Sequence, residues 1–288
     1  MIAELTPGNP VTTQLGASPN TSPALAQHLI QQYGLDKPLY IQYFYFLGRL
    51  VQGNFGNDLE TGVPVLGEVL QALPRTFLLA IASLAIAIPI GMLLGIFSAR
   101  HRNSKLDTIS TVGSLVAASI PNFWLGLVLI LVFGFYLSVL PMSGYGSAAQ
   151  VVLPALTLGL FVAGGITRFT RSSMLEVLNQ DFVRAAKARG LHERVVIYRH
   201  ALKNALIPVV TVIGLYFGTL LSGAVVVENI FGWPGIGTMA FNAITVKNYP
   251  VIQATILVAS ISFVLVNLGV DILYAYIDPR IQYEKARV

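Results

Sequence analysis

The chain has 288 residues, of which 55% are hydrophobic and only 11% are charged, and its mean hydropathy is +0.69. Soluble domains carry roughly 25% charged residues, so this composition excludes an ordinary soluble protein and indicates an integral membrane protein. The chain contains no cysteine, which excludes a disulfide framework and a thiolate metal site. The net charge of +5 does not indicate nucleic acid as a partner, because the basic residues lie at the edges of apolar segments.

Residues 1–73 form a segment that does not span the membrane. Turn residues at 7–10 and 34–38 flank two short amphipathic helices, predicted at residues 24–33 and 39–51, and residues 54–58 form a further turn. The segment begins with neither a basic region nor an apolar region, so no secretory signal is predicted within it.

Residues 74–288 contain the membrane domain. Five apolar stretches are predicted as spans, at about residues 76–98, 111–140, 152–166, 205–227 and 251–274. Most approach the roughly 20 residues that cross the hydrocarbon, but the third is short unless it extends toward Arg171. Pro121 interrupts the second span, and Pro89 and Pro208 are expected to kink their helices. The fold class is therefore all-α, a polytopic bundle of membrane helices.

The basic residues predict the orientation of the spans. Most Lys and Arg residues follow the first, third and fifth spans, whereas residues 141–150 contain none. Cytoplasmic loops carry the excess of basic residues, so we expect residues 1–73 outside and the C-terminus in the cytoplasm.

The loop at about residues 172–204 carries the densest positive charge and is predicted to fold. Asn179 is expected to cap a helix, Asp181 lies in its first turn, and Gly190 ends it with a left-handed cap. Phe182, Ala185 and Ala186 have the i, i+3, i+4 spacing of one helix face. From the residues alone, this helix is either a docking element for a soluble partner or part of a solvated loop that only fixes topology.

The stretch 181–208 resembles the cytoplasmic coupling loop of bacterial ABC-importer permeases, whose motif is Glu-Ala-Ala, three residues, Gly, nine residues, Ile-x-Leu-Pro. Arg184-Ala185-Ala186 takes the place of the first triplet, Gly190 that of the glycine, and His200-x-Leu202-Lys203 that of the last four residues. The Glu, Ile and Pro are missing, as in the peptide-permease branch. Residues 33–38, 53–65, 119–124, 223–228 and 231–237 are also similar to that branch.

The resemblance implies a pore-forming permease subunit of an ATP-driven importer of dipeptides or oligopeptides in the bacterial inner membrane. Carriers of nickel chelate or glutathione belong to the same family and stay open as alternatives, as does a membrane scaffold or passive channel. The implied partners are a second homologous permease, two cytoplasmic ATPase subunits, an extracytoplasmic substrate-binding protein and the lipid bilayer. ATP and Mg belong to the ATPase, so this chain is expected to bind no cofactor and to catalyse no reaction.

The resemblance also implies one further span. Relatives carry six spans, the first of which ends in a turn that residues 7–10 match. We therefore expect that the first span is missing from this sequence and is encoded upstream.

Three groups of residues are candidates for the site. The ATPase-coupling group comprises Arg184, Ala185, Ala186, Lys187, Arg189, Gly190 and Leu191. The small residues Gly214, Gly218 and Ser222, like the pair Gly91 and Gly95, pack either against a second permease subunit or within this one. The outer-loop group, predicted as a gate, comprises Phe231, Trp233, Pro234 and Gly235, although its aromatic residues also suit a membrane-interface belt.

Asp271 is the one acid well inside a predicted span. Acids within a membrane are costly and are functional candidates by default. We expect a structural bond to a backbone amide or to a basic loop residue.

Enzyme motifs are absent. His192-Glu193 begins like the zinc motif H-E-x-x-H, but Val196 stands where the second histidine belongs. The sequence contains neither the phosphate-binding pattern G-x-x-x-x-G-K-[ST] nor the nucleophile elbow G-x-S-x-G. This excludes ATP binding through that loop and disfavours an intramembrane hydrolase.

Overall fold

A computed structural model describes residues 37–277, except for the side chains of residues 39, 42, 46, 222, 223 and 273–277. The turn predicted at residues 7–10, the helix predicted at 24–33 and the basic C-terminal residues lie outside this range. Within the described range the backbone is helical, apart from loops and an isolated antiparallel bridge between Asn57 and Pro64.

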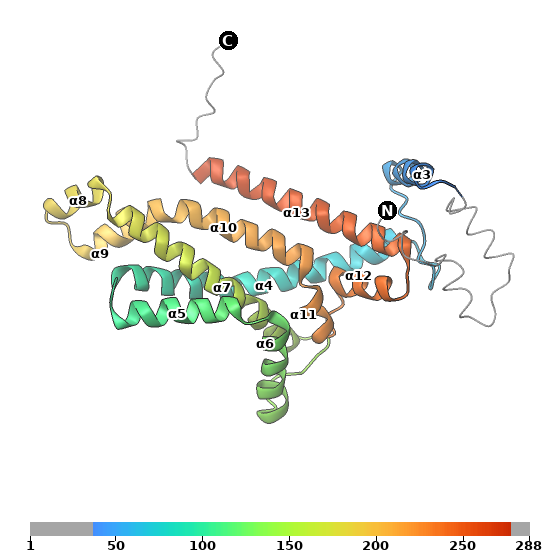
Figure 1. Cartoon of the computed structure of the whole chain (residues 1–288), viewed down its shortest axis with the longest axis horizontal. Coiled ribbons are helices and arrows are strands. Elements are labelled where there is room, and N and C mark those ends of the chain that lie inside the picture. The colour runs from blue at the N-terminus through green and yellow to red at the C-terminus, as the bar shows by residue number, and fades with distance from the viewer. Residues whose placement is uncertain (1–36, 278–288) are drawn as a thin grey trace, which may run out of the picture. The chain divides into compact units, whose positions relative to one another are not determined.

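The described helices in chain order are α3 (Leu39–Val51), α4 (Val65–Arg100), α5 (Lys105–Ser119), α6 (Asn122–Leu129), the π-helical η2 (Ile130–Tyr136), α7 (Ala148–Leu178), α8 (Asp181–Ala188), α9 (Glu193–Val195), the π-helical η3 (Val196–Ala201), α10 (Leu202–Gly223), α11 (Val225–Ile230), α12 (Ile236–Thr245) and α13 (Tyr249–Ile277) (Figure 1). Four helical stretches are long and apolar enough to cross a membrane: 65–100, 148–178, 193–221 and 249–272. The bent pair 105–119 and 122–136 brings the number to five if it counts as one span. The all-helical membrane fold is thus confirmed.

Pro121 bends the second span sharply. The residue before a proline is disfavoured in the helical region, and Ile120 is extended, with φ −71° and ψ 126°. The two halves of the span meet at 98°. Pro154 and Pro208, by contrast, lie inside the continuous helices α7 and α10. The predicted interruption is therefore confirmed at Pro121.

The chain divides into two compact units. One comprises residues 37–76 and 234–260, and the other comprises residues 77–233 and 261–277. In the first unit, Val65 and Val69 of α4 pack with Val251 and Ile252 of α13. Their i, i+4 spacing explains why α4 begins at Val65 rather than at residue 76, where the span was expected. The expected domain boundary at 73/74 falls inside α4.

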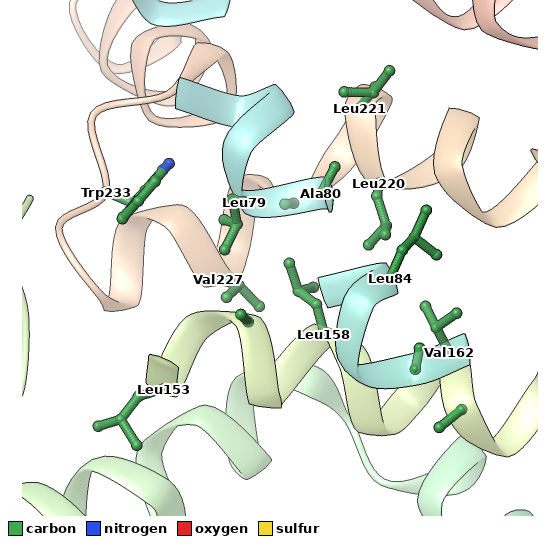
Figure 2. Close-up of a cluster of buried hydrophobic side chains, with 14 of the residues drawn as sticks. Leu79, Ala80, Leu84, Leu153, Leu158, Val162, Leu220, Leu221, Val227 and Trp233 are labelled. Atoms are coloured by element: carbon green, nitrogen blue, oxygen red, sulfur yellow. The ribbon is translucent and has the colours of Figure 1, made fainter. Parts of the chain in front are cut away.

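In the second unit, α7 packs along α5 and along α10, and the three helices run side by side in Figure 1. Its central position makes α7 the most buried of the candidate spans. Small residues bring α4 close to α7: a β-carbon on Gly91 would lie 2.6 Å from Ile166, and one on Gly95 would lie 2.5 Å from Thr170. The pair Gly91 and Gly95 therefore packs within this subunit. Figure 2 shows the core that results, with Leu79 and Leu84 facing Leu158 and Val162.

Candidate coupling site and outer loop

The predicted loop helix is α8. It begins at Asp181, but its N-cap is Gln180, whereas Asn179 ends α7. The prediction of Asn179 as the N-cap is therefore wrong by one residue. The backbone leaves the helical conformation and becomes extended only at Gln180, where ψ is 153°.

Gly190 ends α8 as predicted. Its φ is +76°, in the left-handed region that favours glycine. The amide of Leu191 donates to the carbonyl of Ala186 at 3.4 Å, and the amide of Gly190 donates to that of Lys187 at 3.0 Å. These two bonds form the Schellman arrangement, which satisfies carbonyls at the end of the helix.

One side of α8 is buried against the rest of the chain. Val183 is 0% exposed and Ala186 is 8% exposed, while Phe182 and Ala185 are exposed. The three residues predicted to share one face therefore do not all face the same way. Ala186 packs into the core of this chain and is not open to a partner, whereas Phe182 and Ala185 are exposed. The exposed side of α8 also carries Arg184, Lys187 and Arg189, followed by the partly exposed Leu191.

The buried side of α8 belongs to a hydrophobic cluster that joins four other segments. We call it the α8 cluster, and its members are Ile96, Ala99, Met174, Val177, Val183, Ala186, Val196, Ile197, Ala201 and Ala205. They come from the end of α4, the end of α7, α8, η3 and the start of α10. Figure 1 places α8 and α9 at that end of the helix bundle. A displacement of α8 would thus press on three long helices at once.

The charges around α8 contribute little to holding it. Arg184 and Asp181 form an ion pair at 3.5 Å, with side chains 73% and 98% exposed. Arg100 of α4 lies 3.5 Å from Glu193 of α9. Exposed pairs of this kind contribute about 0–1 kcal/mol, so apolar packing is the stronger attachment.

Three helices near the α8 cluster are joined by a buried polar network that the sequence reading missed. Arg171 of α7 donates to both carboxylate oxygens of Asp107 at the start of α5, at 2.7 and 2.8 Å. Ser98 of α4 donates to the same carboxylate, as does the backbone amide of Asn103 at 2.9 Å. The one local signal was the Ser104-x-x-Asp107 pattern, in which Ser104 caps α5 by accepting from the amide of Asp107.

The glycines of α10 approach α13 in the same chain. A β-carbon on Gly214 would overlap the side chain of Val270, and one on Gly218 would lie 2.9 Å from Phe263. The structure therefore shows internal packing at both glycines, the second of the two alternatives that their spacing leaves open. The side chain of Ser222 lies outside those that the structure describes.

The aromatic residues of the outer loop are buried in the protein. Phe231 is 1% exposed and Trp233 is 0% exposed, so the interface-belt alternative is wrong. The Trp233 ring meets Tyr145 edge-on, with the centroids 4.9 Å apart, and its amide donates to the carbonyl of Glu228 at 2.7 Å. Trp233 lies at one edge of the core in Figure 2.

Pro234 and Gly235 belong to the other unit. The Pro234 carbonyl accepts a bond from Arg75 at 3.3 Å, and Gly235 is the N-cap of α12. The hydroxyl of Thr76 accepts from the amide of Ile236 at 2.9 Å, which satisfies one donor at the start of α12.

Two acids differ from expectation. Asp271 is exposed on α13, and the structure shows neither of the expected bonds between it and the other described residues. Glu228 of α11, by contrast, is 0% exposed, and the sequence reading did not single it out. Among the described residues, no group of three or more His, Cys, Asp and Glu side chains is placed to hold a metal ion.

Comparison with known proteins adds direct relatives. A family model described as "Binding-protein-dependent transport system inner membrane component" matches residues 91–283. The glutathione transport system permease protein GsiC of Escherichia coli (strain K12) is 42% identical over 284 residues, covering 99% of this chain and 92% of that protein. The oligopeptide transport system permease protein AppB of Bacillus subtilis (strain 168) is 40% identical over 294 residues, covering 98% and 92%. The inward-facing MetNI methionine ABC transporter superposes with a TM-score of 0.64 at 18% identity, covering 73% of this chain and 96% of that one, and supports the fold alone.

Proposed function

The chain belongs to the family of binding-protein-dependent transport system inner membrane components, and from that membership we propose that it imports short peptides under the control of α8. It is a permease subunit of an ABC importer of the peptide and glutathione group, and it lies in the inner membrane with several spans. A separate ATPase subunit hydrolyses ATP, and the permease itself binds no cofactor. The transport machinery also includes a substrate-binding protein. The family predicted from the coupling-loop residues is thus confirmed.

The α8 cluster is the observation that supports the coupling role of α8. Val183 and Ala186 fix one side of the helix to the ends of α4, α7 and α10, and the opposite side stays open. Burial of a side chain the size of Val183 contributes about 1.5–3 kcal/mol, so the helix follows these three helices as a unit. Phe182 and Ala185 present the apolar part of the open side, and Arg184, Lys187 and Arg189 surround it with positive charge. A helix that inserts one compact face into a groove is a common docking mode.

The proposed cycle uses this attachment. Two ATPase subunits receive α8 from this chain and from a second, homologous permease. When the ATPases close on ATP, α8 shifts and carries the ends of the attached spans with it. The pore between the two permeases then changes from inward to outward access, a rigid-body transition between discrete states.

The distribution of basic residues in the loops indicates which side of the membrane each loop faces. The positive-inside rule places α8, α9 and the C-terminus in the cytoplasm, and it places the external segment 1–73 on the opposite side. Phe231, Trp233, Pro234 and Gly235 then lie on the outer side, where they would form part of the outer gate and receive substrate from the binding protein.

The substrate class is argued from the relatives. One is named for glutathione and another for oligopeptides, and glutathione is itself a modified tripeptide. A short peptide is therefore the substrate that suits both names. Nickel chelate is the alternative within the family.

Reconstitution tests this function. The chain would be co-expressed with the second permease and the ATPases encoded beside it, purified as a complex, and placed in liposomes with the binding protein outside. We expect ATP-dependent accumulation of radiolabelled tripeptide, and competition by glutathione if the pore accepts both. Accumulation of nickel chelate without peptide would overturn the peptide assignment. If the two permeases purify together with no ATPase bound, the role of α8 as the ATPase-docking helix is wrong.

A further inference from the structure

Arg168 is an exposed cation in α7, the most buried of the candidate spans. Its side chain makes no hydrogen bond or ion pair with any residue that the structure describes. Charged side chains within a membrane span almost always face the interior of the bundle or a water-filled cavity. We propose that Arg168 faces the water-filled path of the substrate and binds the terminal carboxylate of the peptide. The proposal rests on the function above and adds a residue with which this chain itself recognises the substrate.

The depth of Arg168 follows from the contacts between α4 and α7. Two glycines of α4 mark the register of these parallel helices, because β-carbons on them would meet α7 at the pairs Gly91–Ile166 and Gly95–Thr170. Arg168 is therefore level with Leu93, seven residues before the end of α4 at Arg100. At about 1.5 Å of rise per residue, Arg168 lies roughly 10 Å inside that end of the helix pair.

At this depth the α4–α7 pair has two opposite sides. Arg168 is two residues from each α7 member of those contacts, so it is rotated by about 200° from the side of α7 that contacts α4. Leu93 is likewise two residues from each of the two glycines, and it lies on the side of α4 that points away from α7. The pair therefore exposes a leucine on one side and an arginine on the other.

The exposed rows on these two sides differ in polarity. The exposed row of α4 is apolar and comprises Ile81, Ala85, Pro89, Leu93 and Phe97. The exposed row of α7 is polar, since Arg168, Ser172 and Glu176 recur at intervals of four residues, with Phe169 beside them. Lipid suits the first row, whereas the second row requires water or polar partners. The α7 row is thus the side that faces the path of the substrate.

Helices of this chain cover the other sides of α7. It packs along α5 and along α10, which lie on either side of it in Figure 1. Arg171 binds Asp107 of α5, and the hydroxyl of Ser173 donates to the carbonyl of Ala205 in α10 at 2.8 Å. With α4 on a third side, Arg168 lies on the side of α7 that remains open. An open polar side on a central helix suits a path between this chain and a second permease.

The guanidinium of Arg168 suits a carboxylate. It has five donors in a planar fork that matches the two oxygens of that group. Every short peptide with an unblocked C-terminus carries a carboxylate, as does glutathione, so one arginine serves many sequences. Because Arg168 is exposed, water and salt screen the ion pair, and the peptide can leave again.

The first experiment tests whether Arg168 faces water. The chain contains no cysteine, so Arg168→Cys and Leu93→Cys each add one thiol at the same depth. Each complex would be placed in nanodiscs and treated with a charged thiol reagent, and labelling would be read on this chain after separation of the subunits. The reagent reacts with the thiolate, which forms in water, so Arg168→Cys should react at least about tenfold faster than Leu93→Cys.

The second experiment tests the ligand in complexes that keep Arg168. Ser172→Cys adds a thiol one turn from Arg168, and Phe97→Cys is the control on the apolar row of α4. Labelling with a neutral maleimide would be followed without binding protein or ATP. At about ten times its Kd, trialanine should slow labelling of Ser172→Cys about tenfold and leave Phe97→Cys unchanged. Trialanine with a C-terminal amide should protect neither thiol at that concentration.

Substitution of Arg168 then assigns the protection to its guanidinium. Adding Arg168→Gln to Ser172→Cys should raise the trialanine concentration for half-protection by roughly 10- to 100-fold, the loss expected for a hydrogen bond to a charged group. Arg168→Lys should restore part of the loss, because it keeps the charge without the planar fork. Neither substitution should change the response to the amidated peptide.

Three results would overturn the role of Arg168. Equal labelling of Arg168→Cys and Leu93→Cys would mean that both sides face lipid and that Arg168 reaches toward headgroup phosphates. Loss of the second permease from the Arg168→Gln complex would mean that Arg168 pairs with that subunit. Equal protection by the amidated peptide, or no protection, in a complex that still imports trialanine would reject the carboxylate site while the proposed function stands. Protection by trialanine in a complex that imports no peptide would support the site and reject the function.

Discussion

Arg171 of α7 holds Asp107 of α5 through two parallel hydrogen bonds, of 2.7 Å between Nε and Oδ1 and 2.8 Å between Nη2 and Oδ2. Asp107 is 4% exposed, and Ser98 and the Asn103 amide supply further donors to its oxygens. The carboxylate is therefore satisfied from α4, from the α4–α5 turn and from α7. This pair fixes the helix ends on which the α8 cluster forms.

Loss of either partner of this pair should destabilise the permease. Asp107→Asn leaves the guanidinium without its counter-charge, and removing one member of a buried pair costs about 3 kcal/mol or more. Thermal unfolding of the purified complex would measure the loss. The matched control is Arg184→Gln, which breaks an exposed pair and should cost less than about 1 kcal/mol. If both variants unfold at the same temperature as the parent, the Arg171–Asp107 pair does not stabilise the fold.

Gly190→Val should uncouple ATP hydrolysis from transport. The φ of +76° strains a β-branched residue by about 1–2 kcal/mol, so the turn after α8 should rearrange. The expected result is retained ATP hydrolysis with uptake reduced several-fold, measured on the same liposomes.

The control for this change is Gly113→Val. A β-carbon meets no atom within 4 Å at either glycine, but Gly113 lies in α5 with an ordinary helical φ. The two variants thus add the same side chain and differ in backbone conformation. Equal uptake by both would remove Gly190 from the coupling mechanism.

The two sides of α8 should respond differently to truncation. Val183→Ala opens a cavity in the α8 cluster and should cost about 1–3 kcal/mol of stability, with loss of coupling. Phe182→Ala removes an exposed ring, so it should leave thermal stability nearly unchanged and reduce the amount of ATPase that co-purifies. The opposite pattern, with stability lost at Phe182 and binding lost at Val183, would reverse the assignment of the two sides.

The membrane spans could be predicted from the sequence because a helix that crosses a bilayer must be long and apolar, and composition alone reveals such stretches. It also placed α3, the break at Pro121 and the turn at Gly190, since each depends on residues close together in the chain. The bounds of α4 and α7 were too short, because both helices continue past the apolar core where packing and caps maintain them.

The remaining features depend on distant contacts. Asp107 and Arg171 are 64 residues apart, and the local cap that Ser104 forms with Asp107 does not indicate that Asp107 pairs with Arg171. The spacing of Phe182, Ala185 and Ala186 predicts a helix, but α4, α7 and η3 decide which side they cover. Trp233 shows the same limit, because an aromatic residue near a membrane edge suits both an interface belt and a buried core.

Gly214 should tolerate no side chain unless α13 moves away from α10. A β-carbon there overlaps Val270, so Gly214→Ala should cost about 1–3 kcal/mol by overpacking, measured as a lower unfolding temperature of the complex. Adding Val270→Ala removes the overlapping methyl groups and should restore much of the loss, since residues in contact couple in a double-mutant cycle. Gly269→Ala is the matched control on α13, because a β-carbon there meets no atom within 4 Å. A variant Gly214→Ala that stays stable but no longer assembles with the second permease would instead place this glycine at the contact between subunits, and the absence of rescue by Val270→Ala would support that reading.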